Sequence, residues 1–333
     1  MNVLVIGGAG YIGSHMIRLL DRQGHRVVVL DNLSTGFADA ATVGELVIGE
    51  MQDRRLVEQL LSEHKIDTVM HFAACALVGE SVVDPAKYYR NNVVATIELL
   101  DAMRATGVQR IVFSSTCATY GEPTVVPISE AESQSPVNPY GFTKLVIEQA
   151  MTDYAAAYGL GFAALRYFNA AGASPEGDIG EHHDPESHLI PIVLQTALGQ
   201  REHVTIYGDD WPTPDGTCIR DYIHVDDIGA AHLAAMERVT PGEGIKLNLG
   251  TGNGASVREI IAACREVTGH EIPVVSGPRR AGDPPELVAD AALANQILGW
   301  TPRYTDIKSI IETAWHWHRT HPQGYATADA KGG

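Results

Sequence analysis

A tyrosine and a lysine that could transfer protons stand four residues apart in NPYGFTKL, residues 138–145. Asn138 is a good N-cap and Pro139 a good first helical residue, so we expect Tyr140 in the first turn of a helix. Residues i and i+4 share a helix face, so Lys144 should project beside Tyr140. A free phenol has a pKa of about 10, and nearby cations favour the phenolate. The spacing therefore indicates general acid–base chemistry.

The same spacing recurs at Tyr304 and Lys308 in YTDIK, so spacing alone decides nothing. The first pair differs because the stretch FSSTCATYG, residues 113–121, lies upstream of it. This stretch places the hydroxyl side chains of Ser114, Ser115 and Thr116 at the end of an expected strand. In a doubly wound sheet, that end lies over the ligand crevice, where a hydroxyl can bond a sugar or relay its proton. The alternative is that these hydroxyls only cap a turn. We interpret the second pair as packing.

A glycine-rich turn follows the first expected strand in VLVIGGAGYIGSH. Gly8, Gly10 and Gly13 fit GxGxxG, and Gly7 with the last two fits the looser GxxGxxG. Such turns let the backbone approach a pyrophosphate at a helix N-terminus. Asp31 ends the second expected strand, where a carboxylate bonds the adenosine ribose. No arginine follows Asp31 closely to receive a 2′-phosphate, which favours NAD over NADP.

Buried strands alternate with amphipathic helices through the first half of the chain. The expected strands are residues 2–7, 26–31, 67–73, 110–115 and 162–168. The expected helices are residues 11–23, 52–64, 86–106 and 139–158, and three of them end near Gly24, Gly107 and Gly159. This alternation predicts an α/β fold with a doubly wound parallel (Rossmann) sheet.

The pattern changes after about residue 170, where loops rich in glycine, proline and charge separate shorter elements, beginning with an expected helix at 187–199. We expect a second, smaller α+β domain for the substrate. The predicted division is residues 1–172 for NAD and the catalytic pair, 173–328 mainly for the substrate, and 329–333 as a disordered tail.

Composition narrows the possible partners. The net charge is −17 with no basic block, which argues against nucleic-acid binding. The four cysteines form no CxxC pair, which favours a reducing compartment. No apolar run reaches ~18 residues, so no membrane span is expected. The N-terminus runs directly into MNVLVIGGAG and leaves no room for a signal peptide. The expected location is the cytoplasm.

Two histidine clusters, EHHD (181–184) and HWH (316–318), raise the question of a metal. Adjacent histidines do not easily converge on one ion, so we expect no metal site, but a solvated loop and a helix end. Separately, the helices expected at 86–106 and 139–158 carry apolar residues on more than one face. One face must cover the sheet, and the surplus predicts a homodimer with a four-helix contact.

The chain resembles the UDP-glucose 4-epimerase branch of the extended short-chain dehydrogenase/reductase family. The resemblance runs from about residue 2 to the HPQGY at 321–325. It rests on the glycine turn, Asp31, the hydroxyl strand end and YxxxK, and on further stretches: DNLSTG (31–36), HFAA and VGES (71–81), YYRNNV (88–93), LRYFNAAGA (165–173), HLIP (188–191), DGTCIRDYIHVDD (215–227) and RRAGDP (279–284).

The resemblance implies a reaction in which NAD stays bound to the enzyme. The Tyr140 phenolate takes the proton of the sugar 4-hydroxyl while the C4 hydride passes to the nicotinamide. The 4-keto sugar then turns over, and the hydride returns to its opposite face, so UDP-galactose and UDP-glucose interconvert. Thr116 would assist proton transfer, and Lys144 would hold the nicotinamide ribose and tune Tyr140.

The resemblance also implies the binding residues. Besides the glycine turn, Tyr140 and Lys144, the NAD contacts are Tyr11, Ile12, Asp31, Asn32, Leu33, Ser34, Thr35, Gly36, Glu50, Met51, Phe72, Ala73, Ala74, Cys75, Ala76, Asn92 and Phe168. The UDP-sugar contacts are Thr116, Tyr140, Asn169, His188, Leu189, Thr205, Tyr207, Arg220, Arg280 and Asp283. Two arginines suit a diphosphate. For Arg220, the alternative is a surface ion pair with Asp221.

Several positions depart from the family pattern or exclude relatives. Glu50 replaces the more common Asp, and Ala76 replaces a lysine that some members carry. Dehydratases place an Asp-Glu pair after the catalytic Thr, and decarboxylases often a Glu, whereas Cys117 and Ala118 stand here. A non-catalytic NAD-binding module would usually lack the tyrosine or the lysine. Leu287 stands where bulk limits room for an N-acetyl group, so a UDP-N-acetylglucosamine 4-epimerase or a bifunctional epimerase stays open.

Overall fold

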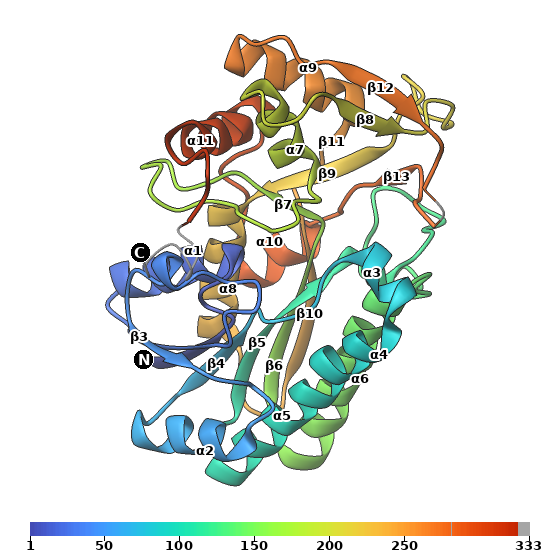
Figure 1. Cartoon of the computed structure of the whole chain (residues 1–333). Coiled ribbons are helices and arrows are strands. Elements are labelled where there is room, and N and C mark those ends of the chain that lie inside the picture. The colour runs from blue at the N-terminus through green and yellow to red at the C-terminus, as the bar shows by residue number, and fades with distance from the viewer. Residues whose placement is uncertain (281, 326–333) are drawn as a thin grey trace.

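Seven parallel strands pair in the order β10-β6-β5-β4-β1-β2-β3. In the computed structural model, which describes residues 1–280 and 282–325, this sheet forms the lower part of the molecule (Figure 1). The strands are β1 (Asn2–Ile6), β2 (Arg26–Asp31), β3 (Glu45–Ile48), β4 (Thr68–His71), β5 (Arg110–Thr116), β6 (Gly161–Tyr167) and β10 (Gly244–Leu249). The predicted strands and the doubly wound fold are confirmed. The sequence analysis missed both edge strands: β3, whose residues are all partly or fully exposed, and β10, which follows the predicted domain boundary.

Helices cover both faces of the sheet, so the inner strands are buried on two sides and read as apolar runs. One face packs on α2 (Arg54–Glu63), α5 (Ala95–Thr106) and α6 (Pro139–Tyr158). The other packs on α1 (Tyr11–Arg22), α8 (Val225–Arg238) and α10 (Ala292–Leu298). Gly107 and Gly159 end α5 and α6 in the left-handed conformation, and Gly24 follows α1 with the same sign of φ, as predicted.

The helix expected at 86–106 is interrupted. It consists of α4 (Pro85–Tyr88), one π-helical stretch (Tyr89–Val94) and α5, and a further short helix, α3 (Val78–Val83), precedes it. Asn92 lies buried in the π-helical stretch and exchanges two hydrogen bonds with the backbone of Cys75, at 2.9 and 3.0 Å. Such π-bulges are common at functional sites. Here it turns a polar side chain towards the segment that follows β4.

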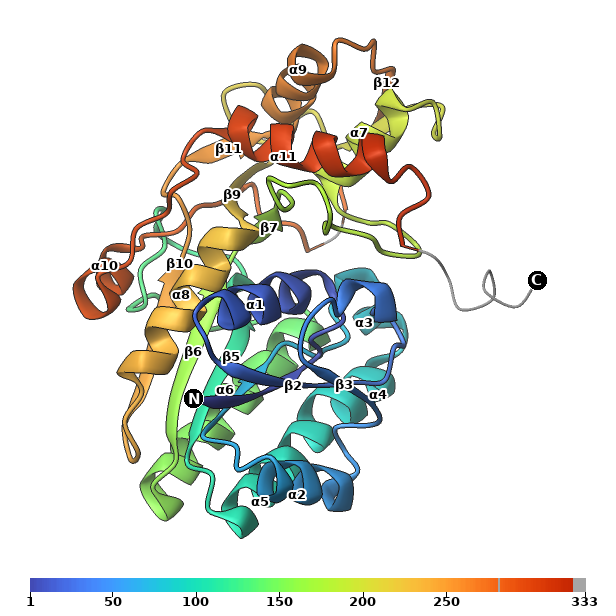
Figure 2. The same ribbon diagram turned by 90° about the vertical axis from the view of Figure 1, so that its left-hand side faces the viewer.

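The upper part is smaller and has its own core. Two short sheets join β7 (Asn169–Ala171), β9 (Ile219–His224), β11 (Gly254–Ser256) and β13 (Glu286–Leu287), and β8 (Val204–Tyr207) with β12 (Val274–Gly277). They pack with α7 (Leu189–Ala197), α9 (Val257–Thr268) and α11 (Ile307–Thr320) (Figure 2). Two 3-10 turns, Ala38–Ala40 and Cys117–Thr119, complete the described elements.

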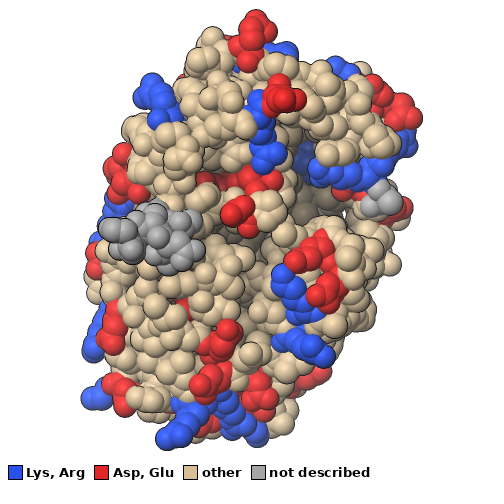
Figure 3. All heavy atoms as spheres, viewed as in Figure 1, with Lys and Arg blue, Asp and Glu red and all other residues tan. Residues whose placement is uncertain are grey.

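The chain returns to the lower part after the predicted boundary at residue 172. Strand β10 joins the edge of the seven-stranded sheet, and α8 packs against α1. Between the two parts the surface is hollowed, and Lys and Arg atoms lie along the upper rim of the hollow (Figure 3). Within the described residues, no helix has the length and apolar character to cross a membrane. The predicted tail at 329–333 lies outside the described residues.

Candidate active site

Helix α6 begins as predicted and places Tyr140 in its first turn. The Asn138 side chain accepts a hydrogen bond from the backbone N–H of Gly141 at 2.9 Å, and Pro139 is the first helical residue. The carbonyl of Ala118 lies so close to Gly141 that a Cβ there would approach its oxygen to 2.4 Å. The capped end is therefore pressed against the turn that follows β5, where Thr116 lies.

Tyr140 lies beside Thr116, which is buried at the end of β5. Burial raises the pKa of Tyr140 above its ordinary value, Tyr167 adds to the rise, and the hydroxyl of Thr116 acts to lower it. We expected Lys144 to lower the pKa of Tyr140, but in the chain alone the effect of burial is larger and the pKa is raised. Thr116 is buried at the end of β5, so β5 and α6 together position the pair.

Lys144 is buried one turn further along the same helix face. Its Nζ donates to the carbonyl oxygen of Ser114 at 2.8 Å and lies 4.6 Å from the ring centre of Phe113. Burial lowers the pKa of Lys144 to about 7, although Glu148 acts to raise it. The ammonium is therefore poorly solvated and readily releases its proton, which is unusual for a lysine.

Sequence reasoning missed a buried ion pair beneath Lys144. Glu148 accepts from Arg166 Nε at 2.9 Å and Nη2 at 2.5 Å, and from Ser115 Oγ at 2.5 Å. Both charged side chains are almost fully buried. Because Tyr140, Lys144 and Glu148 stand at successive i+4 positions, the spacing carried a signal for this residue. The pair links the site's helix to β6.

The glycine turn forms a cradle that fits a dinucleotide. A Cβ at Gly7 would lie 2.5 Å from the backbone nitrogen of Ala73, and one at Gly13 would lie 2.1 Å from the oxygen of Gly7. Gly10 is the N-cap of α1 and places no side chain over its first turn. Free backbone N–H groups at a helix N-terminus attract phosphate, so these residues can hold the NAD pyrophosphate.

The other predicted NAD contacts follow carboxyl ends of neighbouring strands. Asp31 accepts from the N–H groups of Ala9 and Leu33, both at 2.9 Å, and burial raises its pKa. The side chains of Met51 and Phe168 are buried in apolar clusters. The predicted NAD contacts lie at or just beyond the carboxyl ends of five strands: residues 7–13 at β1, 31–36 at β2, 50–51 at β3, 72–76 at β4 and 168 at β6. Asn92 reaches the same edge of the sheet from the π-helical stretch.

The predicted UDP-sugar contacts come from the upper part. Arg280 stacks on the ring of Tyr207, with its guanidinium carbon 3.9 Å from the ring centre. Arg220 faces Asp283, with 3.9 Å between Nη2 and Oδ1. Thr205 lies on β8, Asn169 on β7, and His188 and Leu189 at the start of α7.

The alternative pairing of Arg220 with Asp221 is not found. Asp221 is fully buried and accepts hydrogen bonds from Thr251, Gly252 and Ala289 instead. Neighbouring residues of a strand point to opposite faces, so Arg220 on β9 is directed away from this carboxylate. Two arginines therefore remain available near Tyr207 and Asp283.

Leu287 packs against a small apolar cluster that borders the catalytic turn. The cluster holds Cys117, directly after Thr116, and Phe168, a predicted NAD contact. Burial raises the pKa of the Cys117 thiol to about 12, so this residue cannot act as a general acid at neutral pH in the way a dehydratase requires.

The second YxxxK pair packs, as predicted. Tyr304 stacks on His224 at 3.8 Å between ring centres, and Lys308 pairs with Glu266 at 2.7 Å. HWH lies in the last turns of α11, as predicted, although His318 is buried. The EHHD loop is not simply solvated, because Glu181 is buried and converges with His183, Glu186 and His188. The sequence analysis considered only adjacent histidines, whereas the loop brings together residues two to five positions apart.

Comparison with known proteins identifies the family of the chain. The model of the NAD dependent epimerase/dehydratase family matches residues 3–250, and the chain belongs to this family. The UDP-glucose 4-epimerase of Halalkalibacterium halodurans is 54% identical over 328 residues, which span 98% of each chain. The crystal structure of UDP-glucose 4-epimerase from Brucella ovis in complex with NAD is similar with a TM-score of 0.92 and 53% identity, covering 95% of this chain and 98% of that one. The enzyme from Bifidobacterium longum in complex with NAD+ and UDP has a TM-score of 0.93 and 37% identity, covering 98% and 100%.

Proposed function

We propose that the chain is an isomerase that interconverts UDP-galactose and UDP-glucose, with NAD as its resident cofactor. The placement of Tyr140, in the first turn of α6, beside Thr116 at the carboxyl end of β5 carries this proposal. Lys144 is held next to the same strand end, because its Nζ donates to the carbonyl oxygen of Ser114. The full-length relatives named UDP-glucose 4-epimerase support the same activity.

Tyr140 serves as the base for the sugar 4-hydroxyl. Burial holds its pKa high in the chain alone, so its ionisation needs an added positive charge. Bound NAD+ supplies such a charge, together with reversible acceptance of the C4 hydride. The hydroxyl of Thr116 favours the phenolate and can orient it towards the sugar. Lys144, held by Ser114, binds the nicotinamide ribose.

The upper part holds the UDP group while the sugar moves. Arg220 and Arg280 bind the diphosphate, since guanidinium groups form paired, charge-assisted hydrogen bonds to phosphate oxygens. Tyr207 and Asp283 keep these arginines in place through the stacking and pairing already described. A firmly held diphosphate leaves the hexose free to turn and present either face of C4.

Purified protein given UDP-galactose without added NAD tests the proposal. We expect UDP-glucose to form until equilibrium, with NAD found in the denatured protein and no net NADH release. A requirement for added stoichiometric NAD, or accumulation of NADH with product, would instead indicate a dehydrogenase. Parallel assays with UDP-N-acetylgalactosamine test the alternative epimerase, and Leu287→Tyr should abolish that activity while it spares UDP-galactose turnover.

The protein acts as a homodimer in the cytoplasm. Exposed apolar side chains gather on the outer side of the π-helical stretch and α6, namely Tyr89, Val94 and Phe142. The rings of Tyr89 and Phe142 meet edge to face, with 6.5 Å between their centres. They therefore present a continuous apolar surface that a second copy of the chain can cover. All four cysteines are free, which supports a reducing compartment.

A further inference from the structure

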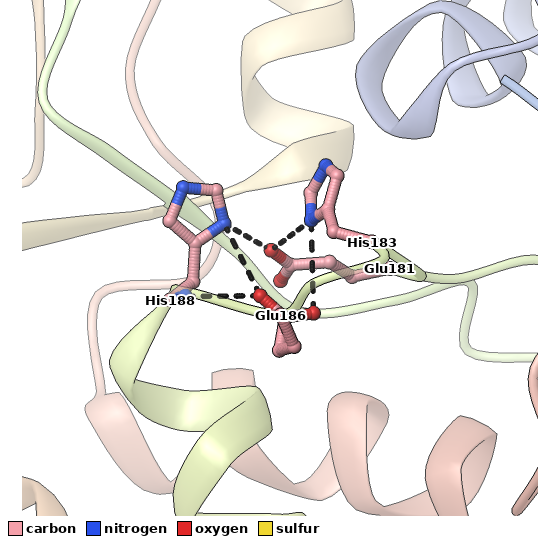
Figure 4. Close-up of side chains that lie close together, drawn as sticks. All are labelled: Glu181, His183, Glu186 and His188. Atoms are coloured by element: carbon pink, nitrogen blue, oxygen red, sulfur yellow. Dashed lines mark hydrogen bonds and ion pairs between the residues drawn. The ribbon is translucent and has the colours of Figure 1, made fainter. Parts of the chain in front are cut away.

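Four potential metal ligands converge in the loop before α7, outside the catalytic pair. Glu181, His183, Glu186 and His188 follow the spacing E-x-H-x-x-E-x-H, and one ligand atom of each lies within 4.8 Å of every other. Figure 4 shows both carboxylates and both imidazoles turned towards one point. Each imidazole presents its Nδ1 atom to the carboxylates, so the two rings approach the centre in the same way.

Both carboxylates are buried, and that of Glu186 is incompletely bonded. Glu186 Oε1 accepts from the N–H groups of Ser187 and His188 at 2.8 and 2.9 Å. Its side chain is only 2% exposed, yet Oε2 has no hydrogen-bond partner among the described residues and points at His183 Nδ1, 3.6 Å away. That Nδ1 atom is likewise without a hydrogen bond within the described chain. A buried polar atom without a partner is costly and calls for a ligand.

The separations between the donor atoms suit a four-coordinate ion. His183 Nδ1 lies 3.3 Å from Glu181 Oε1 and 3.6 Å from Glu186 Oε2, and the four donor atoms all lie within 4.8 Å of one another. Ligands at about 2.0–2.2 Å from a tetrahedral zinc are separated from one another by about 3.3–3.6 Å. Glu181 and His188 are closer than this and must open slightly. A divalent ion also neutralises the two carboxylates when both imidazoles are uncharged.

We propose that Glu181, His183, Glu186 and His188 bind one Zn²⁺ ion that fastens this loop to the start of α7. Two imidazole nitrogens and two carboxylate oxygens form a zinc donor set, whereas Mg²⁺ and Ca²⁺ require six or more oxygen ligands. The loop is already tied to α11, because Trp317 Nε1 donates to the carbonyl of Glu181 at 3.1 Å. The ion would therefore order the segment that leads into α7, in which His188 occupies the N-cap position and Leu189 is the first helical residue.

Zinc binding to the untagged, chelator-treated holoenzyme tests this site. We expect saturable binding of one equivalent per chain in competition with a chromophoric chelator, and a higher thermal unfolding midpoint in zinc-loaded protein. Glu186→Gln and His183→Gln should each weaken binding by more than the ~10–100-fold that loss of an outer-shell partner costs. His203→Gln, which changes an exposed histidine outside the cluster, should bind zinc as the wild type does.

Cobalt provides a measurement that needs no variant. Co²⁺ bound to the wild-type chain should show the intense visible absorption of a four-coordinate site, and Zn²⁺ should displace it. Failure of the wild-type chain to bind zinc in a saturable way, six-coordinate cobalt spectra, or equal binding by the wild type and both folded cluster variants would overturn the proposal. Each of those results would mean that the four side chains form ion pairs between protonated histidines and carboxylates, with no bound metal.

Discussion

At the scale of single residues, burial drives the pKa values of Tyr140 and Lys144, the proposed catalytic pair, in opposite directions. It raises the pKa of Tyr140 and lowers that of Lys144 to about 7, because a low-dielectric site disfavours the charged form of each. Burial therefore disfavours the phenolate of Tyr140 and the ammonium of Lys144 alike. If Tyr140 is the base, as we propose, the charge of the oxidised cofactor would favour its phenolate.

Tyr140→Phe should remove the base and keep the surrounding packing. General acid–base catalysis by one side chain contributes about 10²–10⁴-fold, so we expect kcat to fall by at least ~100-fold. NAD released on denaturation should match the wild type, because the ring and Lys144 remain. Conversion of UDP-galactose in a coupled assay measures the change. Turnover within a few-fold of wild type would show that another group takes the proton.

At the scale of elements, the site depends on where α6 begins. The Asn138 cap and Pro139 start the helix against the Ala118 carbonyl, and one helix face then carries Tyr140 and Lys144. Strand β5 ends at Thr116 on the same edge. The geometry of the catalytic pair is therefore set by a helix start and a strand end, two features that each depend on backbone hydrogen bonds.

Asn138→Ala should therefore lower both stability and kcat. Loss of an N-cap costs about 1 kcal/mol, and a frayed first turn displaces Tyr140 from Thr116. Asp306→Ala is the matched control, because Asp306 caps α11 by accepting from the backbone N–H of Lys308 at 3.4 Å, and it stands among none of the predicted NAD or UDP-sugar contacts. Urea denaturation should show similar losses for both variants. Only Asn138→Ala should lose turnover. An equal kcat for the two variants would show that the cap of α6 does not position Tyr140 for catalysis.

At the scale of the whole molecule, the surface formed by Tyr89, Val94 and Phe142 is where a second copy is expected. Val94 is 51% exposed, so a charge there should leave the fold intact and prevent association. We expect Val94→Glu to convert a dimer into a monomer in light scattering at micromolar concentration. The nearby change Lys87→Glu alters charge outside this surface and should remain dimeric. A monomeric wild type would refute the assembly.

Buried histidines make the molecule sensitive to acid. Burial lowers the pKa of His71 to about 3 and those of His224 and His232 to about 4. Between these values and the unfolded value of about 6.5, the unfolded chain binds more protons, so stability falls as pH falls. Each group contributes up to about 1.4 kcal/mol per pH unit in that window.

The urea midpoint should therefore drop from pH 7 to pH 5. His232→Gln should show a shallower drop than the wild type, although from a lower starting stability, because one such group is removed. His203→Gln is the exposed control and should follow the wild-type slope. A midpoint that stays constant from pH 7 to pH 5 would contradict this account.

Local patterns in the sequence determined the fold class and most of the residues of the candidate site. Runs of buried strand residues, a glycine turn and a capped helix start are encoded by neighbours in the chain, so β1, α1, β5 and α6 could be placed without coordinates. Edge strand β3 escaped because its partly exposed residues bury too little to leave an apolar run. The π-helical stretch escaped because its apolar periodicity resembles that of an α-helix.

Tertiary structure alone decided which distant residues meet. Burial of Lys144 against Ser114, and of Arg166 against Glu148, depends on how α6 lies on β5 and β6. The loop cluster of Glu181 and its partners follows from packing against α11, which no spacing in EHHD revealed. The pairing of YxxxK with hydroxyls upstream was readable in sequence because sheet topology is predictable. The pKa values were not, since desolvation is a property of the whole surrounding fold.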